Sequence, residues 1–400
     1  MNKAMFKVAG VAVVAASLAL TGCGSRADNT GGTSGAKVAK IGVMSPTSGD
    51  LSALGLGIRN SVDLAVKQAN ESNAIPGWTL EVMAVDDQAT PDVGKNAATK
   101  LASDDQVVGV VGPLNSSVGQ SVIPVLAAAS IVEVSPANTN PSLTQGEDLA
   151  NPKRPYANYF RTCTTDAVQG PFAAQYLLES GIKTVATIHD KKAYGQGLVE
   201  NFTSAFEKGG GTVVAAETIN PDDKDFSAVI SKVKAAKPKA VYYGGEYPQA
   251  GPLSKQMKAA GLDVPLMGGD GIFDPKFIEL GGSNGDLATS VGAPVDTLAS
   301  AKAFVDAYNA AGYADPYAAY GAYSYDAANA IIDALKVSLA NATDAKSARQ
   351  ATIDAVGAVK FDGATGPVAF DQYGDAVARV LTVYKVTDGA WAAEKTGELK

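Results

Sequence analysis

The sequence predicts an α/β protein made of two doubly wound parallel-sheet lobes joined by hinge strands. Three observations support this fold class. Short β-rich apolar runs alternate with helical patterns, the alternating series occurs twice, and a body of about 360 residues is too long for one typical core. Strands that alternate with helices form parallel sheets with helices on both faces.

The first half of the chain contains one complete alternating series. Its apolar residues recur at helical spacing over 58–71, and Thr90 with Pro91 marks the start of the next helix. Strands are predicted over 40–44, 80–85, 107–111 and 131–134, and helices over 58–71, 91–103 and 118–129.

The second half repeats the pattern, and the end of the chain departs from it. Helices are predicted over 172–180, 197–208, 226–236 and 253–260, and strands over 185–188, 212–218, 240–243 and 266–267. Helices over 301–311, 318–339 and 345–356 follow, then antiparallel strands over 368–370, 379–386 and 391–393 around a turn at 387–390. These last elements are too few for a third domain, so we expect the chain to cross between the lobes. The predicted first lobe is 38–164 plus 294–376, and the second is 165–293 plus 377–400.

The first 37 residues indicate export and anchoring. Lys3 and Lys7 precede an apolar run of residues 8–20, which is too short to span a bilayer, and Leu20-Thr21-Gly22-Cys23 follows. This ending resembles the lipobox of bacterial lipoproteins, which implies a signal peptide over 1–22 and lipidation of Cys23. The Gly- and Ser-rich stretch 23–37 then reads as a flexible tether. The protein is expected outside the cytoplasm, lipid-anchored to the cell membrane. The alternative is an ordinary signal peptide with an incidental cysteine.

Composition excludes several classes of protein. The formal net charge is −8 and no Lys/Arg run is present, so nucleic-acid binding is not expected. Lipidation of Cys23 would leave Cys163 without a disulfide partner, and Cys163 is predicted to be a small buried hydrophobe. One histidine and one free cysteine cannot build a zinc site. We expect no cofactor, no metal and a monomer.

Candidate binding residues lie in the loops that follow predicted strands, because ligands bind beyond the carboxyl ends of parallel strands. Loop 112–117 leads into the helix predicted over 118–129, and Ser116 and Ser117 stand near its N-cap, where free backbone N–H groups attract a carboxylate; the alternative is plain helix capping. Loop 135–141 brings the hydroxyl of Thr139 to the same edge. In the second half, Asp270 stands among glycines and could receive an ammonium group. These features predict a clamp for a zwitterion.

A set of short motifs carries a family resemblance from Ala39 to the C-terminus. In order, they are Met44-Ser45-Pro46, Val85-Asp86-Asp87, Gly112-Pro113-Leu114-Asn115-Ser116-Ser117, Ser135-Pro136-Ala137, Gln169-Gly170-Pro171, His189-Asp190-Lys191, Asp225-Phe226-Ser227, Tyr242-Tyr243-Gly244-Gly245 and Met267-Gly268. In this order the chain resembles the periplasmic binding proteins for leucine, isoleucine and valine that serve ABC importers. The resemblance implies the type I fold of that class, an amino-acid ligand and an ABC permease as partner.

The resemblance also implies roles for individual residues. Ser116 would hold the ligand carboxylate, and Ala137 with Thr139 would take the ammonium and carboxylate. Tyr194 would cover the ligand from the second lobe, and Asp270 would neutralise the ammonium. The remaining two positions, Leu54 and Glu246, stand where an aromatic is common in the family. An unpaired buried carboxylate is costly, so Glu246 either turns to solvent or meets a polar or basic ligand group.

An enzyme is the other class to weigh. Gly281-Gly282-Ser283-Asn284-Gly285 fits the G-x-S-x-G pattern, but a helical segment precedes it and His189 lies earlier in the chain. We therefore expect no enzyme. The same fold could instead bind a polar amino acid or an amide, or act as the input of a sensor, and the identity of the amino acid stays open.

Overall fold

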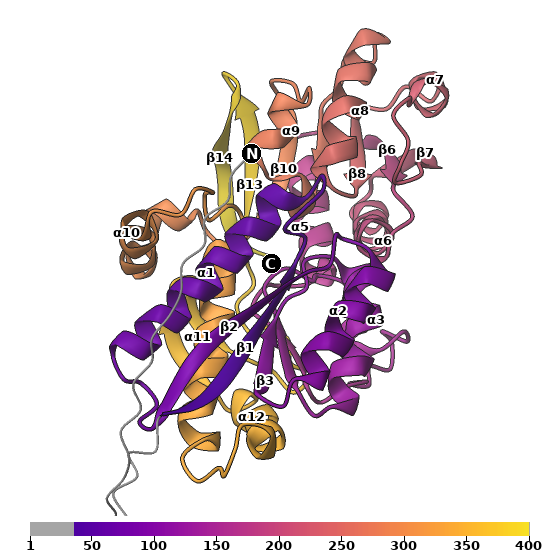
Figure 1. Ribbon diagram of the computed structural model, residues 1–400. Helices are drawn as coiled ribbons and strands as arrows, with labels where there is room; N and C mark the ends of the chain where they lie inside the picture. The colour runs from indigo at the N-terminus through magenta and orange to yellow at the C-terminus, as the bar shows by residue number, and fades with distance from the viewer. Residues whose placement is uncertain (1–35, 400) are drawn as a thin grey trace, which may run out of the picture. The chain divides into compact units, whose positions relative to one another are not determined.

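The described part of the chain, residues 36–399 of the computed structural model, contains one parallel sheet, one mixed sheet and one small hairpin (Figure 1). The first sheet has the order β2-β1-β3-β4-β5, and all its strands are parallel. Its bounds are Lys37–Ser45 (β1), Trp78–Asp86 (β2), Val107–Val111 (β3), Val132–Ser135 (β4) and Tyr159–Arg161 (β5).

The second sheet has seven strands in the order β14-β13-β10-β9-β8-β6-β7. Five of these strands run parallel, whereas β13 pairs antiparallel with both β10 and β14. The bounds are Thr184–His189 (β6), Thr212–Thr218 (β7), Ala240–Gly244 (β8), Leu266–Gly268 (β9), Leu287–Val291 (β10), Val380–Thr387 (β13) and Ala390–Glu398 (β14). The separate hairpin is Lys360–Gly363 (β11) with Gly366–Ala369 (β12).

Helices cover both faces of each sheet. The first sheet has α1, α11 and α12 on one face and α2 and α3 on the other, and the second has α5 and α6 opposite α7 and α8 (Figure 1). The α-helices are Ser52–Glu71 (α1), Pro91–Ser103 (α2), Ser116–Ala128 (α3), Ser142–Gln145 (α4), Asp166–Glu179 (α5), Ala193–Lys208 (α6), Ser227–Ala235 (α7), Tyr247–Ala259 (α8), Pro275–Glu279 (α9), Lys302–Ala311 (α10), Gly321–Ser338 (α11) and Arg349–Val356 (α12). Short 3-10 turns span Asp270–Ile272, Val295–Thr297, Ala299–Ala301 and Lys346–Ala348.

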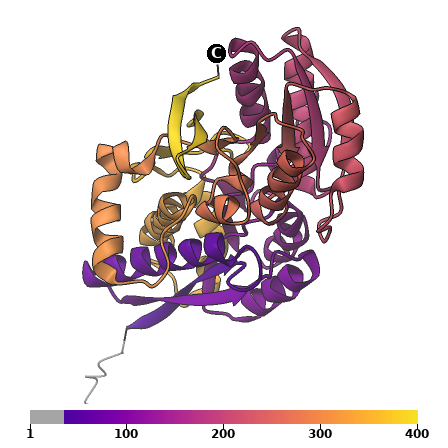
Figure 2. The same cartoon turned by 90° about the horizontal axis from the view of Figure 1, so that it is seen from above.

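Each sheet with its helices is called a lobe here. Helix α1 shows why these elements assemble: Ile58, Val62, Ala65 and Ala69 recur at helical spacing and are buried. Strands β3 and β8 are buried along their whole length, as expected of parallel strands covered on both faces. The chain passes between the sheets after β5, after β10 and after β12. Figure 2 shows the result: the indigo N-terminal elements lie beside the orange α10 and α11, and the yellow hairpin lies with the second sheet.

Several predicted elements differ from the structure. The C-terminal hairpin is confirmed, but the strand predicted at 368–370 does not join it, because β12 pairs with β11 instead. Strands β5, β10 and β11, of three to five residues each, were missed. Helices α5 and α8 begin at Asp166 and Tyr247, about six residues before their predicted starts, and each contains an internal proline.

The N-terminal segment lies mostly outside the described residues. The predicted signal peptide and the lipidation site Cys23 belong to that segment. Strand β1 begins at Lys37, so it takes in the last residue of the predicted tether. Within residues 36–399 no helix is both long and apolar enough to cross a bilayer.

Candidate functional site

A small cavity lies between the two lobes, beyond the carboxyl ends of their strands. It has a volume of about 20 Å³, which is room for about one water molecule in this conformation. Six of the seven predicted ligand residues line it: Leu54, Ser116, Ala137, Tyr194, Glu246 and Asp270. Leu114, Asn115, Gly271 and Tyr320 complete the wall.

The first lobe contributes the start of α3 and the loop after β4. Ser116 is the first residue of α3, where the opening N–H groups have no partner within the helix. Its Oγ accepts a hydrogen bond of 3.4 Å from the backbone N–H of Asn140. Asn138 joins the two loops, because its Nδ2 donates to the carbonyls of Pro113 (3.1 Å) and Leu114 (2.8 Å). The helix start is therefore held in place and open to an anion.

Thr139 does not line the cavity, unlike its neighbour Ala137. Its side chain is fully buried, and its Oγ1 has no hydrogen-bond partner with acceptable geometry in the described chain. The carbonyl of Thr139 accepts from the backbone N–H of Asp166 at 2.8 Å. Burial raises the pKa of the Asp166 carboxyl well above its usual range, and the nearby Thr139 hydroxyl lowers it only in part. In this conformation Thr139 supports the loop and does not face the ligand space.

Asp270 is surrounded by hydrogen-bond donors. It opens the 3-10 turn after β9, and its Oδ1 accepts from Gln169 Nε2 (3.0 Å) and from the Tyr194 hydroxyl (2.8 Å). Its Oδ2 accepts from the hydroxyl of Tyr320 at 2.9 Å. Burial raises the pKa of Asp270, although these three hydrogen bonds oppose the rise. A ligand ammonium beside this carboxylate would compensate its buried charge.

Tyr320 was missed by sequence reasoning. It was assigned to the interior of a helix predicted from 318, but it precedes α11, which begins at Gly321. From that position in the first lobe its hydroxyl reaches Asp270 in the second lobe. The available signal was the run of tyrosines at 313, 317, 320, 323 and 325, which is unusual in a chain with 7% aromatic residues.

Glu246 does not take the first of the two outcomes that the sequence offered, a side chain turned to solvent. It is the N-cap residue of α8 and is 4% exposed, so it does not turn to solvent. Its Oε2 lies 2.9 Å from Lys192 Nζ, and its Oε1 accepts a hydrogen bond of 2.7 Å from Asn115 Nδ2. The buried charge therefore already has a counter-ion within its own lobe, and no ligand charge is needed to balance it.

Asp190 shares this charged group. Its Oδ2 lies 3.9 Å from Lys192 Nζ, and its Oδ1 accepts from the backbone N–H of Lys192 at 3.0 Å. Burial, together with the negative charge of Glu246, raises the pKa of Asp190 to about 7. The ammonium group of Lys192 is thus shared by two carboxylates, Asp190 and Glu246, at the edge of the cavity.

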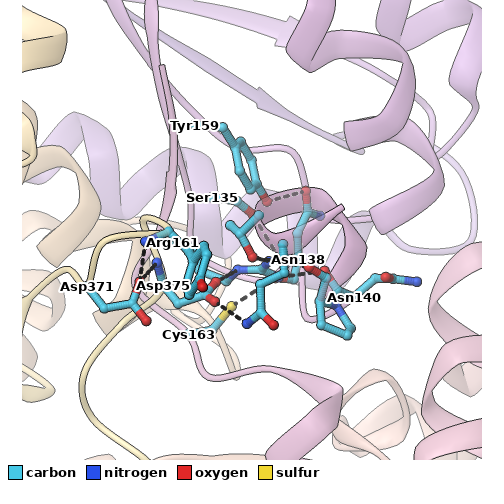
Figure 3. Close-up of polar contacts among 12 residues, drawn as sticks. Ser135, Asn138, Asn140, Tyr159, Arg161, Cys163, Asp371 and Asp375 are labelled. Carbon is cyan, nitrogen blue, oxygen red and sulfur yellow. Dashed lines mark hydrogen bonds and ion pairs between the residues drawn. The ribbon is translucent and has the colours of Figure 1, made fainter. Parts of the chain in front are cut away.

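Arg161 braces the loop that carries Ala137 (Figure 3). Its Nη1 donates to the carbonyls of Asn138 (2.6 Å) and Asn140 (2.9 Å), and its Nε forms an ion pair of 2.7 Å with Asp375 Oδ1. Cys163 Sγ also contacts the carbonyl of Asn138, at 3.4 Å. Cys163 is fully buried, as the sequence predicted. The contact with Asp375 also links the loop to the segment after β12.

The site offers hydrogen-bonding groups and charge complementarity but no metal centre. Among residues 36–399, no cluster of three His, Cys, Asp or Glu side chains could hold a metal ion. The arrangement can hold a small zwitterion, with a helix start on one lobe and a buried carboxylate on the other.

Comparisons with known proteins agree with the fold. A family model described as "Periplasmic binding protein" matches residues 38–390. The Leu/Ile/Val-binding protein BraC3 of Rhizobium johnstonii is 32% identical over 358 residues, covering 89% of this chain and 92% of its own. The leucine-, isoleucine-, valine-, threonine- and alanine-binding protein of Pseudomonas aeruginosa is 32% identical over 349 residues, covering 86% and 89%.

Solved structures share the whole architecture. The branched-chain amino acid transporter substrate-binding protein LivJ of Streptococcus pneumoniae, in complex with isoleucine, superposes with a TM-score of 0.80 at 27% identity. The match covers 91% of this chain and 100% of that one. The chain therefore belongs to the periplasmic binding protein family, together with these leucine-, isoleucine- and valine-binding relatives.

Proposed function

We propose that this protein captures one α-amino acid between its two lobes and delivers it to an ABC permease. The first candidates are leucine, isoleucine and valine, which the relatives are named for. The observation that carries the proposal is the pairing, across one cavity, of the open start of α3 at Ser116 with the buried carboxylate of Asp270. The role is one of binding without catalysis, and the protein acts as a monomer.

The two ends of an amino acid match the two sides of the cavity. The carboxylate would lie at the start of α3, where backbone N–H groups and the Ser116 hydroxyl donate hydrogen bonds. The ammonium would lie beside Asp270, and Tyr194 would cover the ligand. Leu54, Leu114 and Ala137 supply apolar surface for the side chain.

Opening and closing of the lobes would give the ligand access. The cavity of about 20 Å³ is too small for an amino acid, so the ligand would enter an open form and the walls would adjust around it. Contacts made by both lobes exist only in the closed form, and the ligand therefore favours closure. We propose 38–164 plus 294–376 and 165–293 plus 377–400 as the two moving units.

Family membership implies a location outside the cytoplasm, and we propose a lipid anchor on Cys23. Its support is the sequence Leu20-Thr21-Gly22-Cys23 with a Gly- and Ser-rich tether behind it. Replacing Cys23 by serine is expected to release the protein from membranes in a fractionation experiment. A Cys23→Ser protein that stays with the membrane would contradict lipidation.

A thermal-shift panel on the protein from Gly24 onward tests the ligand class. Each common amino acid is added at millimolar concentration, with amides, polyamines and aromatic acids as comparison compounds. A ligand at about 100 times its dissociation constant adds roughly 2.7 kcal/mol and raises the melting midpoint by a few degrees. A shift with α-amino acids alone supports the proposal, and a shift with none of them contradicts it.

A further inference from the structure

We propose that Asn115 selects the ligand by its side chain, and that the cavity prefers a small α-amino acid whose side chain donates a hydrogen bond. Threonine is the sharpest probe of this chemistry, because it has the shape of valine with a hydroxyl in place of one methyl. The inference rests on the proposed function and names the substrate class of the same site.

The first support is an unpartnered acceptor in the cavity wall. Asn115 immediately precedes α3, is 4% exposed and lines the cavity. Its Nδ2 donates to Glu246 Oε1 at 2.7 Å, but its Oδ1 is buried and has no donor in residues 36–399. Native proteins rarely leave such a group unpaired, because it loses its hydrogen bonds to water on burial.

The second support is that the orientation of this amide is fixed. A carboxylate only accepts hydrogen bonds, and the carboxylate of Glu246 forms an ion pair of 2.9 Å with Lys192 Nζ. Turning the Asn115 amide by half a rotation would therefore place two acceptors face to face. The nitrogen must point to Glu246, and the oxygen is the group left for another partner.

The third support is the composition of the surrounding wall. Asp270 already accepts from three side-chain donors, so it does not compete for a ligand hydroxyl. Glu246 adds further acceptor capacity beside Asn115, whereas Lys192 pairs with Glu246 and does not line the cavity. This part of the wall accepts hydrogen bonds and repels a ligand side chain that only accepts them.

The apolar remainder of the wall suits methyl groups. Leu54, Leu114 and Ala137 would pack against them. A side chain with one methyl and one hydroxyl on the same branch point satisfies both surfaces. The Pseudomonas aeruginosa relative, whose name includes threonine and alanine beside the branched-chain amino acids, shows that such ligands are compatible with the family.

Titration calorimetry with threonine and valine tests the inference, because the two ligands differ by one hydroxyl. The protein from Gly24 onward is expected to bind threonine at least tenfold more tightly than valine. Valine binding as tightly as threonine, or leucine binding without threonine, would overturn the inference and leave the proposed function intact. No binding of threonine, valine, leucine or any other amino acid would overturn both.

Variants then assign the preference to Asn115. In Asn115→Leu the threonine-to-valine affinity ratio is expected to fall below one, since the acceptor is lost and the wall becomes apolar. Asn115→Ala adds no bulk and is expected to bring the threonine-to-valine affinity ratio close to one. This variant keeps the test possible if the leucine variant does not fold. Gln120→Leu makes the same chemical change on the exposed face of α3 and should keep the wild-type ratio. A threonine preference that survives in both Asn115 variants contradicts the assignment.

Discussion

The hydroxyl of Tyr320 donates a hydrogen bond of 2.9 Å to Oδ2 of Asp270, and so connects the first lobe to the acidic residue of the second. Further hydrogen bonds cross between the lobes, among them those from Asn115 Nδ2 to Glu246, from Asn140 Nδ2 to the carbonyl of Ala193 (2.7 Å) and from the Tyr247 hydroxyl to the carbonyl of Asp50. Because these bonds join the two lobes, they contribute to the free energy of closing, and the contacts of the ligand supply the rest.

We expect Tyr320→Phe to weaken amino-acid binding about tenfold, as measured by titration calorimetry. A hydrogen bond to a charged acceptor contributes about 1.5–3 kcal/mol, part of which Asp270 recovers from water in the open form. Tyr325→Phe is the matched control, because the Tyr325 hydroxyl bonds Gln68 within the first lobe. Equal affinities in both variants and the wild type would show that the bond to Asp270 does not contribute to closure.

The two ends of the zwitterion site should be separable by substitution. Ser116→Ala removes a donor to the ligand carboxylate, and Asp270→Asn removes the charge opposite the ammonium while keeping the side-chain shape. Each is expected to lower affinity at least tenfold with an unchanged circular dichroism spectrum. Asp263→Asn is the control, since that carboxylate is 90% exposed. Wild-type affinity in both site variants would rule out the clamp.

Local patterns in the sequence predicted the fold well, but they did not predict contacts between segments that are far apart in the chain. Ser116 and Asp270, chosen because each follows a predicted strand in a polar loop, line the same cavity after β3 and β9. The pairing of Glu246 with Lys192 spans 54 residues, and that with Asn115 spans 131. No spacing rule reports such pairs, so the charge balance of Glu246 could not be read from the chain.

The starts of two helices and the orientation of one loop residue were also not predicted from the sequence. Pro171 and Pro252 lie inside α5 and α8, where the sequence was read as loop before the helix. Thr139 lies in the predicted loop, but its side chain does not line the cavity, and Arg161 holds the carbonyls of Asn138 and Asn140 on either side of it. The position of this loop could be predicted from the sequence, whereas the direction in which its side chains point could not.

Arg161→Met tests the bracing of that loop. The substitution removes the counter-ion of Asp375 and the donor to the carbonyls of Asn138 and Asn140, and breaking a buried ion pair costs about 3–5 kcal/mol of unfolding free energy. Denaturant unfolding measures this loss, and amino-acid affinity should fall as well, because the same loop carries Ala137. Arg379→Met is the control, since Arg379 is exposed.

A double variant separates the charge effect from packing. Arg161→Met combined with Asp375→Leu removes both charges, so its loss of stability should be smaller than the sum of the two single losses. Strict additivity would show that the two side chains are not coupled across their 2.7 Å contact.

Two adjacent aspartates at the end of β2 should respond to pH in opposite ways. Burial raises the pKa of Asp87 to about 7, and its Oδ2 has no hydrogen-bond partner in the described chain. For Asp86, burial also raises the pKa, but hydrogen bonds from Ser48, Gln88 and Thr47 outweigh it, and the net pKa is lowered. Asp87 is therefore stabilising when protonated and Asp86 when ionised.

The sign of each effect follows from proton linkage. Asp87 binds its proton more tightly in the folded state, so its contribution to stability is complete below about pH 4 and is lost as the pH rises through 7. Asp87→Asn, which keeps the acceptor for the N–H of Ala89, should raise the melting midpoint at pH 8 and change it little at pH 4. Asp86→Asn should lower the midpoint at pH 8, because the contribution of Asp86 is present above its unfolded pKa and lost as the pH falls. Thermal melts of both variants across pH 4–8 measure the difference, and midpoint shifts of the same sign at pH 8 would contradict the assignment of the two protonation states.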